Sequence, residues 1–295
     1  MTTSLDNQVQ LRDGRILGYA EYGDPGSTPV FHFHGAPSSR LECSHPVTGK
    51  IAERLHVRLV VPDRPGMGRS AFRRNRTLLD WPDDVAELAG ALALDRFAVV
   101  GMSGGGPYVA ACAYKIPHLL SAVGIISGIG PVDAPGALDG MEKSNRLQIT
   151  LARKAPWLLT LLFRTMARSL RHEPDKLLAQ FIAALSDSDR AAMAEPDAQA
   201  TTLRMLDAAF QQGARGATWD TSLCARPWGF RLQDIAMPVH LWHGEKDNLC
   251  PVGMGRYVAE SIPDCDAAFY PDDGHLSMMR HYDEVLTTVA YRGSE

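Results

Sequence analysis

Several features that mark membrane, secreted or nucleic-acid-binding proteins are missing from this sequence. Its apolar runs, such as 97–100 and 123–126, fall far short of the roughly 20 residues that a membrane-spanning helix needs. Residues 1–8 include neither the basic start nor the apolar centre of a secretion signal. The 30 basic and 34 acidic side chains give a net charge of −4, without the basic excess that binds a nucleic-acid backbone. We therefore expect a cytoplasmic protein with no stable membrane insertion and no nucleic-acid partner.

Cysteine is scarce, and its spacing predicts neither a disulfide framework nor a metal site. The five cysteines are odd in number and include no CxxC pair. Without a secretion signal they are typical of reduced thiols that mostly fill the core. His32 and His34 share one face of an expected strand, as a metal-binding pair would, but no further residue with metal-ligand spacing follows them. We expect structural histidines there, and neither a metal nor another cofactor.

What the sequence does have is size and an ordinary globular composition. Its 295 residues are 45% apolar and 22% charged. A chain of this length buries roughly three quarters of the surface that its unfolded form exposes. No internal repeat or low-complexity tract is present. These properties exclude a disordered chain, which could not offset the entropy of ordering, and a collagen-like one.

Short apolar segments alternate with helical segments over the first part of the chain. The expected strands are 16–22, 30–34, 57–61, 97–101 and 122–127, and the expected helices are 49–56, 80–92 and 107–115. Strand character returns at 239–243 and 267–270. Alternation of this kind is typical of βαβ units around a buried, mostly parallel sheet, so we predict an α/β fold.

The alternation is interrupted between about residues 136 and 221, where only helical patterns occur. We therefore divide the chain into an α/β core domain, 1–135 and 222–295, and an all-helical cap, 136–221. A helical insertion between strands of an α/β sheet is expected to cover the carboxyl ends of the strands, where such sheets bind ligands.

The sequence Gly101-Met-Ser103-Gly-Gly105 lies between an apolar strand and the helix that follows it. A G-x-S-x-G motif alone is weak, but this context is that of a nucleophile elbow, in which a serine occupies a strained turn flanked by glycines. Dinucleotide binding is the competing interpretation, and the GxGxxG pattern fails because position 103 is serine. We predict that Ser103 is a nucleophile.

A serine hydroxyl needs a base to accept its proton, and that base needs a carboxylate to orient it. His275 lies in a loop after the last expected strand, whereas His243 lies at a strand end and is predicted to pack in the core. We therefore predict His275 as the base. Asp247 also follows a strand, and the order Ser103…Asp247…His275 is typical of one hydrolase architecture. Glu245 and Asp133 remain alternative acids.

Ester-type chemistry also requires donors for a developing oxyanion. The backbone N–H of Gly104, after the nucleophile, is one predicted donor, and that of Ala36 is the other, because the loop His34-Gly-Ala-Pro follows a strand. Three further residues are predicted to bind substrate: Gly35, Met102 and Trp157.

Five motifs in order resemble those of the α/β-hydrolase family. They are His34-Gly-Ala-Pro37, Asp63-Arg-Pro-Gly-Met-Gly-Arg-Ser70, Gly101-Met-Ser-Gly-Gly105, His243-Gly-Glu-Lys-Asp247 and Gly274-His275. The resemblance covers nearly the whole chain. It implies an eight-stranded, mostly parallel sheet with helices on both faces, a helical cap inserted after the sixth strand, and a Ser103–His275–Asp247 triad that acts through an acyl-enzyme. Asp63 is interpreted as a structural turn residue.

Departures from known subfamilies narrow the implied activity. Epoxide hydrolases and haloalkane dehalogenases of the family carry aspartate at the elbow, where this chain has Ser103. Proline iminopeptidases usually carry His-Gly-Gly-Pro-Gly and Gly-x-Ser-Trp-Gly, where this chain has His34-Gly-Ala-Pro-Ser and Gly101-Met-Ser-Gly-Gly. We therefore expect a serine hydrolase for a small-to-medium apolar ester, lactone or thioester. The alternatives are a carbon–carbon bond hydrolase or cofactor-free perhydrolase with the same triad, or a non-catalytic binding protein. The expected partner is a small-molecule substrate, with monomer or homodimer left open.

The expected cap is strongly cationic over one stretch. No acidic residue occurs between Ser144 and His172, which enclose Arg146, Arg153, Lys154, Arg164, Arg168 and Arg171. Three interpretations stay open. The helices could present a solvated basic face, the cations could favour an anionic substrate in an apolar pocket, or they could attract the chain to acidic membrane surfaces.

Overall fold

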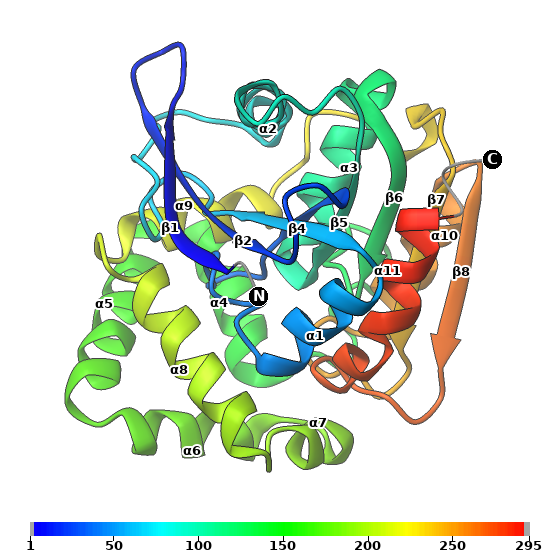
Figure 1. Cartoon of the computed structure of the whole chain (residues 1–295). Helices are drawn as coiled ribbons and strands as arrows, with labels where there is room; N and C mark the ends of the chain where they lie inside the picture. The colour runs from blue at the N-terminus through cyan, green and yellow to red at the C-terminus, as the bar shows by residue number, and fades with distance from the viewer. Residues whose placement is uncertain (1–2, 292–295) are drawn as a thin grey trace.

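The computed structural model describes residues 3–291 and builds them around one eight-stranded sheet (Figure 1). Its strand order is β1-β2-β4-β3-β5-β6-β7-β8. The strands are β1 (Ser4–Gln10), β2 (Ile16–Tyr22), β3 (Thr28–Phe33), β4 (Val57–Pro62), β5 (Phe97–Met102), β6 (Leu120–Ile126), β7 (Val239–Gly244) and β8 (Cys265–Tyr270). β1 pairs antiparallel with β2, and β2 pairs antiparallel with β4. From β4 onward in the sheet order all neighbouring strands, including β3, pair parallel, which confirms the predicted mostly parallel sheet.

β5, at the centre of the sheet, is apolar along its whole length because helices cover both faces of the sheet. Every residue of β5 is buried, and β5 pairs with β3 on one side and β6 on the other. The sequence pattern does not predict β1, because its side chains are mainly polar and exposed at the edge of the sheet. Its hydrogen bonds to β2, rather than a buried face, make it a strand.

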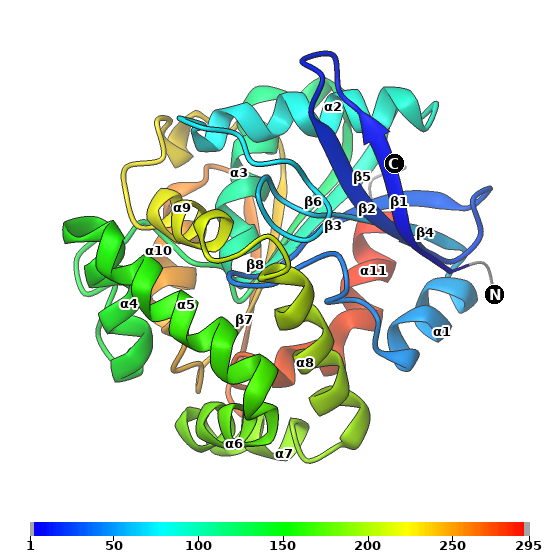
Figure 2. The same ribbon diagram turned by 90° about the vertical axis from the view of Figure 1, so that its left-hand side faces the viewer.

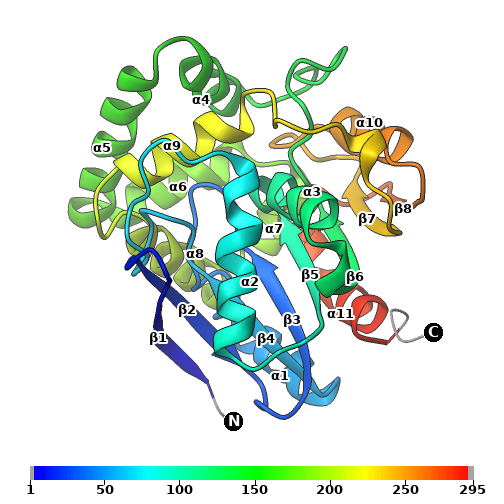
Figure 3. The same cartoon turned by 90° about the horizontal axis from the view of Figure 1, so that it is seen from above.

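Helices cover the two faces of the sheet in two groups (Figure 3). One face packs against α2 (Trp81–Ala91), α3 (Gly106–Lys115) and α10 (Val252–Ser261), and the other packs against α1 (Pro46–Arg54) and α11 (Tyr282–Tyr291). Each group forms its own apolar cluster with the sheet. The sheet is therefore held rigidly, and the loops at its carboxyl edge have a fixed base.

Six helices lie between β6 and β7 and gather at one side of the molecule (Figure 2). They are α4 (Lys143–Lys154), α5 (Pro156–His172), α6 (Pro174–Ala184), α7 (Asp187–Ala192), α8 (Pro196–Ala209) and α9 (Arg215–Cys224). The insertion thus follows the sixth strand, but its last helix ends at Cys224 rather than at 221. The last turn of α9 was missed because Thr221 and Ser222 are weak helix formers, and here their hydroxyls bond carbonyls one turn earlier.

The inserted helices share an apolar cluster with the α/β core. Leu159 and Phe163 of α5 and Phe210 next to α8 join Met67 and Met254 of the core in this cluster. All five cysteines are free thiols, and four of them are buried. Within residues 3–291, no helix is both long enough and apolar enough to cross a membrane.

Candidate active site

Ser103 occupies a sharp turn between β5 and α3. Its backbone φ is +55°, in the left-handed region that costs a non-glycine residue energy and that marks functional turns. The flanking glycines permit the turn, because a Cβ on Gly101 would lie 2.8 Å from the Gly105 carbonyl oxygen and one on Gly105 would lie 2.1 Å from that of Phe33. The predicted elbow geometry is therefore present, and the serine side chain stands at the carboxyl edge of the sheet.

Asp247 and His275 form a buried pair at the same edge, after β7 and β8. His275 Nδ1 lies 2.7 Å from Asp247 Oδ2. The other carboxylate oxygen accepts the backbone N–H groups of Leu249 and Cys250, each at 2.8 Å, so the carboxylate is fixed in orientation. Because the carboxylate accepts, Nδ1 of His275 carries the proton, and Nε2 is left to exchange one.

The pKa of His275 reflects two opposing effects. Burial alone would lower it, but the negative charge of Asp247 and its hydrogen bond outweigh burial and raise the pKa above the ordinary histidine value. Smaller contributions in the same direction come from the charges of Asp189 and Glu42. His275 is thus a stronger base than a free imidazole.

Ser103 and His275 are not directly hydrogen bonded. Among residues 3–291, the contact of Ser103 Oγ is with Cys250 Sγ, at 3.8 Å. Cys250 in turn donates its N–H to Asp247, so it joins the serine to the Asp247–His275 pair. Hydrogen bonds between nucleophile and base are often long in the absence of substrate.

The alternative acids and the second histidine take other places. Glu245 pairs with Arg256 at 2.7 Å on the surface, and Asp133 is exposed. His243 is buried, and its Nε2 lies 2.8 Å from the Cys250 carbonyl oxygen. Burial lowers its pKa, so it is neutral, and its Nε2 also lies 3.5 Å from Asp247 Oδ2. The structure brings Asp247, and not these alternatives, to His275.

The loop after β3 places the amide of Ala36 beside the elbow. A Cβ built on Gly104 would lie 3.0 Å from the Ala36 nitrogen and 2.6 Å from its Cβ, so only glycine fits at 104. In the part of the chain that the structure describes, the Ala36 N–H has no protein acceptor within hydrogen-bonding distance. The Gly104 N–H stands at the start of a helical turn, where it has no acceptor within that turn. Two free amides therefore face the same small space.

Glu42 is a site neighbour that sequence reasoning missed. One of its carboxylate oxygens accepts the N–H of Gly35 at 2.8 Å and the hydroxyl of Ser38 at 2.7 Å, and the other lies 2.9 Å from His32 Nε2. Burial opposes its ionisation, but the hydrogen bond and charge of His32 lower the pKa of Glu42 to about 2. Glu42 therefore fixes the loop that carries Ala36. No recognised motif includes it, although its partners His32, Gly35 and Ser38 all lie within ten residues of it.

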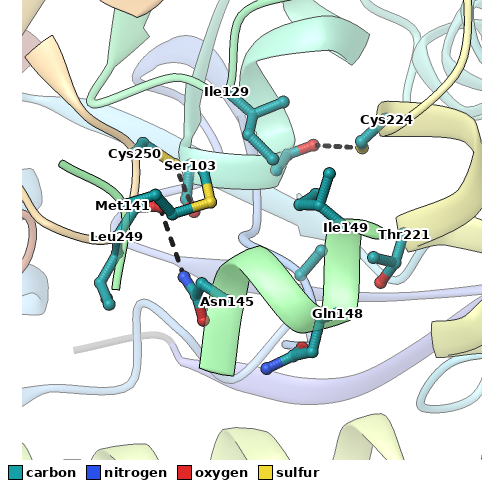
Figure 4. Close-up of a pocket in the computed structure, with 12 residues that line it drawn as sticks. Ser103, Ile129, Met141, Asn145, Gln148, Ile149, Thr221, Cys224, Leu249 and Cys250 are labelled. Atoms are coloured by element: carbon teal, nitrogen blue, oxygen red, sulfur yellow. Dashed lines mark hydrogen bonds between the residues drawn. The ribbon is translucent and has the colours of Figure 1, made fainter. Parts of the chain in front are cut away.

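A small pocket opens above Ser103 (Figure 4). Its volume is about 40 Å³, which is small compared with ordinary ligand sites. Its walls come from core loops, from α4 and from α9: Ala36, Ser103, Gly104, Ile129, Met141, Asn145, Gln148, Ile149, Thr221, Cys224, Leu249 and Cys250. The lining is mainly apolar with a few polar groups, which suits the acyl part of a small compound.

The three predicted substrate-binding residues fare differently. Gly35 lies next to the serine, since a Cβ there would be 3.5 Å from Ser103 Cβ, but it does not line the pocket. Met102 packs in the core cluster of β5. Trp157 is corrected to a surface position, because its side chain is 66% exposed on the outer face of α5. The prediction rested on the apolar sequence of this helix, but α5 has an exposed apolar face as well as a buried one, and Trp157 lies on the exposed face.

Neither a metal site nor a disulfide contributes to this arrangement within residues 3–291. No group of three or more histidine, cysteine or carboxylate side chains there could hold a metal ion. His34 instead accepts the N–H of Arg64 at its Nε2 (3.2 Å), and its Nδ1 lies 2.8 Å from the Gly35 carbonyl oxygen. His32 and His34 are thus held by the protein itself.

Comparisons with known proteins agree with this architecture. The family model described as the alpha/beta hydrolase fold matches residues 28–282. A pimeloyl-acyl carrier protein methyl ester esterase from Aromatoleum aromaticum is 27% identical over 239 residues, which cover 79% of this chain and 86% of that one.

Solved structures extend the likeness to the whole fold. An alpha/beta hydrolase fold protein from Nakamurella multipartita superposes with a TM-score of 0.70 at 22% identity, covering 98% of this chain and 100% of that one. An esterase from Rhodococcus sp. ECU1013 gives 0.67 at 20% identity, with 99% of each chain covered. Together with the match of the family model over most of the sequence, the parallel sheet and elbow lead to one conclusion: the chain belongs to the α/β-hydrolase fold family.

Proposed function

We propose that this protein is a serine esterase that uses Ser103, His275 and Asp247 through an acyl-enzyme. The observation that carries the proposal is the 2.7 Å contact of Asp247 with His275, at the same sheet edge as a serine whose φ is +55°. A strained, half-buried serine at the same sheet edge as an oriented base is the arrangement that nucleophilic acyl transfer requires. The esterase names of the relatives support ester bonds as the substrate class.

The first half of the reaction forms the acyl-enzyme. Ser103 Oγ attacks the ester carbonyl carbon while His275 Nε2 takes its proton, and Asp247 stabilises the imidazolium. The carbonyl oxygen becomes an oxyanion, which accepts hydrogen bonds from the Ala36 and Gly104 N–H groups. The carbon–oxygen bond to the leaving group then breaks, and His275 returns the proton to the departing alcohol.

The second half releases the acid. Water enters where the alcohol left, His275 takes its proton, and the hydroxide attacks the acyl carbon. The same two amides stabilise the second oxyanion. It collapses as the bond from the acyl carbon to Ser103 Oγ breaks, His275 returns the proton to Oγ, and the carboxylic acid leaves. No metal or cofactor is required for either half.

The pocket supports a small acyl group. Its volume of about 40 Å³ and its largely apolar lining favour a short acyl chain, and the amides of Asn145 and Gln148 on α4 add polar contacts. Larger substrates require α4 or its side chains to move. The natural substrate class is therefore proposed to be esters, thioesters or lactones of small-to-medium apolar compounds.

The test is covalent labelling of purified protein with a fluorophosphonate, followed by peptide mass spectrometry and assays of p-nitrophenyl esters of rising acyl length. We expect one label, on Ser103, and faster turnover of short acyl chains. Ser103→Ala should lose both. Ser127→Ala is the matched control, because that buried hydroxyl has no hydrogen-bond partner.

Two results would contradict the proposal. Folded protein that takes no label would favour a binding protein. A protein that is labelled but cleaves only diketones, or forms peracids from peroxide, would favour the carbon–carbon hydrolase or perhydrolase alternative.

A further inference from the structure

Two fully buried aspartates of the inserted helices point at loops of the α/β core. Asp189 lies on α7 and Asp220 on α9, and neither side chain is exposed to solvent. Burying a carboxylate is costly unless hydrogen bonds and charges satisfy it. The partners of these two groups therefore show what they hold in place.

Asp189 binds the backbone that carries His275. Its Oδ2 accepts the N–H of His275, and its Oδ1 accepts those of Leu276 and Ser277, all at 2.9 Å. The preceding loop residue passes directly over the carboxylate, since a Cβ on Gly274 would lie 2.5 Å from Asp189 Oδ2. Three consecutive amides on one carboxylate fix the position of the imidazole.

Asp220 reaches the other half of the site through Arg64. Both carboxylate oxygens of Asp220 accept hydrogen bonds from the Arg64 guanidinium, at 2.8 to 3.1 Å. The guanidinium also donates to the carbonyl oxygens of His34 and, at 2.7 Å, of Gly35. The carbonyl of Gly35 and the N–H of Ala36 belong to one peptide unit, so Arg64 sets the direction in which that N–H points.

The same peptide is held by His34 as well. Because His34 Nε2 accepts the N–H of Arg64, its Nδ1 carries the proton and donates to the Gly35 carbonyl oxygen at 2.8 Å. Two donors on one carbonyl polarise the amide and strengthen its N–H as a donor. The free N–H of Ala36 is thus oriented and activated from behind.

Asp220 is the single anion among two buried cations. Arg76 donates to it at 2.7 Å, the Tyr108 hydroxyl donates at 2.5 Å, and the Arg64 guanidinium stacks 4.6 Å from the centre of the Tyr108 ring. Burial alone would raise the pKa of Asp220, but the charges of Arg64 and Arg76 hold it well below its usual range. Asp220 therefore stays ionised and keeps Arg64 in place.

We propose that Asp189 and Asp220 are positioning residues that the inserted helices supply to the active site. Asp189 sets the position of the His275 imidazole, and Asp220, through Arg64, sets the direction of the Gly35–Ala36 peptide that stabilises the oxyanion. This proposal rests on the proposed esterase function. It assigns to the insertion a part in the chemistry, besides covering the pocket.

The test compares Asp189→Asn and Asp220→Asn with wild type on a short p-nitrophenyl ester. Each variant should lower kcat about 10- to 100-fold while KM changes less than about 3-fold, because alignment matters in the transition state. Asp189→Asn should also move the acidic limb of kcat/KM to lower pH, because its charge raises the pKa of His275. Asp220→Asn should leave that limb in place and weaken a boronic-acid inhibitor in parallel with kcat.

Controls separate the possible outcomes. Asp187→Asn lies on the same helix as Asp189 but is exposed, and it should match wild type. If Asp220→Asn does not fold, Arg64→Lys replaces it, since an ammonium group cannot span both carbonyls and Asp220. Normal kcat and pH limb in folded variants would overturn the proposal, whereas an inactive wild type would overturn the esterase function itself.

A different observation concerns the outer face of α4 and α5. Five of the nine large apolar side chains that are exposed within residues 3–291 lie there: Leu147, Trp157, Leu158, Leu161 and Leu162. Six exposed cations surround them: Arg146, Arg153, Lys154, Arg164, Arg168 and Arg171. We call these eleven residues the α4–α5 surface. Large exposed apolar groups gathered on one face indicate an interaction site.

The charge of the α4–α5 surface selects its partner. No acidic residue occurs from 143 to 172, and within residues 3–291 none of the six cations forms a salt bridge. α5 is apolar on two sides: Leu159, Phe163 and Leu170 face the protein, and Trp157 and Leu161 face outward. Exposed tryptophan and leucine flanked by arginine and lysine are typical of helices that lie in the interface of an acidic bilayer.

We infer that the α4–α5 surface binds an anionic lipid bilayer. The leucines and Trp157 enter the boundary between headgroups and acyl chains, and the cations pair with lipid phosphates. A second copy on a two-fold axis would bring two sets of these cations together, at a cost in repulsion. An acidic protein would match the cations but leaves the four leucines unexplained.

The test is co-sedimentation of the full chain with phosphatidylcholine vesicles that lack or contain 30% phosphatidylglycerol. We expect binding to the anionic vesicles alone, reduced at least about 10-fold between 0.05 and 0.5 M salt. The triple variant Arg153→Gln, Arg164→Gln, Arg168→Gln should lose binding. The matched triple Lys50→Gln, Arg226→Gln, Arg231→Gln removes exposed cations elsewhere and should keep it.

Three results would overturn the inference. Folded protein that does not sediment with anionic vesicles, or that binds neutral vesicles equally well, excludes a charge-selected bilayer. A concentration-dependent dimer that Leu161→Asn abolishes would assign the surface to a second copy. Hydrolysis of a soluble ester is measured in parallel and should be unchanged in both triple variants.

Discussion

Two pairs among the inserted helices meet the rest of the molecule differently. α7 and α9 each bury an aspartate against a core loop, Asp189 at His275 and Asp220 at Arg64. α4 and α5 carry exposed leucines, a 66% exposed Trp157 and unpaired cations on their outer face, and only the inner side of α4 lines the pocket. One pair is held by buried charge. The other is held mainly by apolar packing, with one hydrogen bond from Asn145 to the Leu249 carbonyl oxygen.

The contacts of the two pairs of helices indicate which part of the insertion can move. Displacing α7 or α9 would leave buried charges and backbone amides without partners, which costs several kcal/mol. Displacing α4 and α5 breaks mainly apolar contacts, for which a bilayer or a substrate can substitute. We therefore expect substrates to enter past α4, while α7 and α9 stay in place during turnover.

The largest effect is expected at the pair that the anchored helices support. Asp247→Asn should lower kcat by about 10⁴-fold, because the amide no longer accepts from Nδ1 of His275 and the wrong tautomer results. Initial rates on p-nitrophenyl acetate measure it. Glu245→Gln, a surface neighbour paired with Arg256, is the control and should match wild type. Full activity of Asp247→Asn would require another acid, with Asp133 tested next.

A stability comparison tests the two pairs of helices directly. Asp220→Ala should lower the free energy of unfolding by about 3–5 kcal/mol, because it strands two buried guanidinium groups. Arg164→Ala on the exposed face of α5 should change it by less than about 0.5 kcal/mol. Urea unfolding measures both. Equal losses of unfolding free energy would mean that the buried charge on α9 stabilises the fold no more than an exposed charge on α5.

Substitutions on α4 test whether its inner side limits the length of the acyl group. Ile149→Ala should raise kcat/KM for a butyrate ester relative to an acetate ester by about 10-fold, because the added space accepts two more methylenes. Leu147→Ala lies on the same helix but faces solvent, and it should leave the ratio unchanged. A panel of p-nitrophenyl esters gives the ratios. An unchanged ratio for Ile149→Ala would place the acyl group elsewhere.

The smallest expected effect is in the pH profile. Because the net effect of Asp247 and burial raises the pKa of His275, protonated imidazole persists above the ordinary value near 6.5. The acidic limb of kcat/KM should therefore lie above pH 6.5, with activity lost as the pH falls through it. Rates from pH 5 to 9 at constant ionic strength measure it. A limb below 6.5 would mean that desolvation dominates.

Much of the fold was predictable, because local patterns carry it. The apolar run that ends at Gly101, with a helical pattern after it, predicts β5 and the helix that follows. Short apolar runs predict the later strands in the same way. The predicted pairing of His275 with Asp247 agrees with the contact in the structure, since both follow parallel strands whose carboxyl ends meet. The polar edge strand β1 was not predictable, because pairing with β2 rather than a buried face defines it.

Sequence patterns failed for residues whose role depends on what their side chains contact. Trp157 is apolar and sits in an apolar helix, yet α5 has two apolar faces and the tryptophan is on the outer one. Asp189 and Asp220 belong to no recognisable motif, because their partners are far away in the sequence. Glu42 lies close to its partners but matches no recognised motif either. Periodicity reports how apolar a face is, but it does not report what that face meets.

The sequence by itself determined the mostly parallel α/β sheet, the elbow at Ser103 and the order of the residues proposed to act with it. These depend on hydrophobic period and on backbone strain at glycine-flanked turns, which are local properties. Tertiary structure alone decided which carboxylates are buried, how the Ala36 amide is held, and which face of α5 meets water. Those features depend on charges and amides brought together across the chain, where burial makes each partner indispensable.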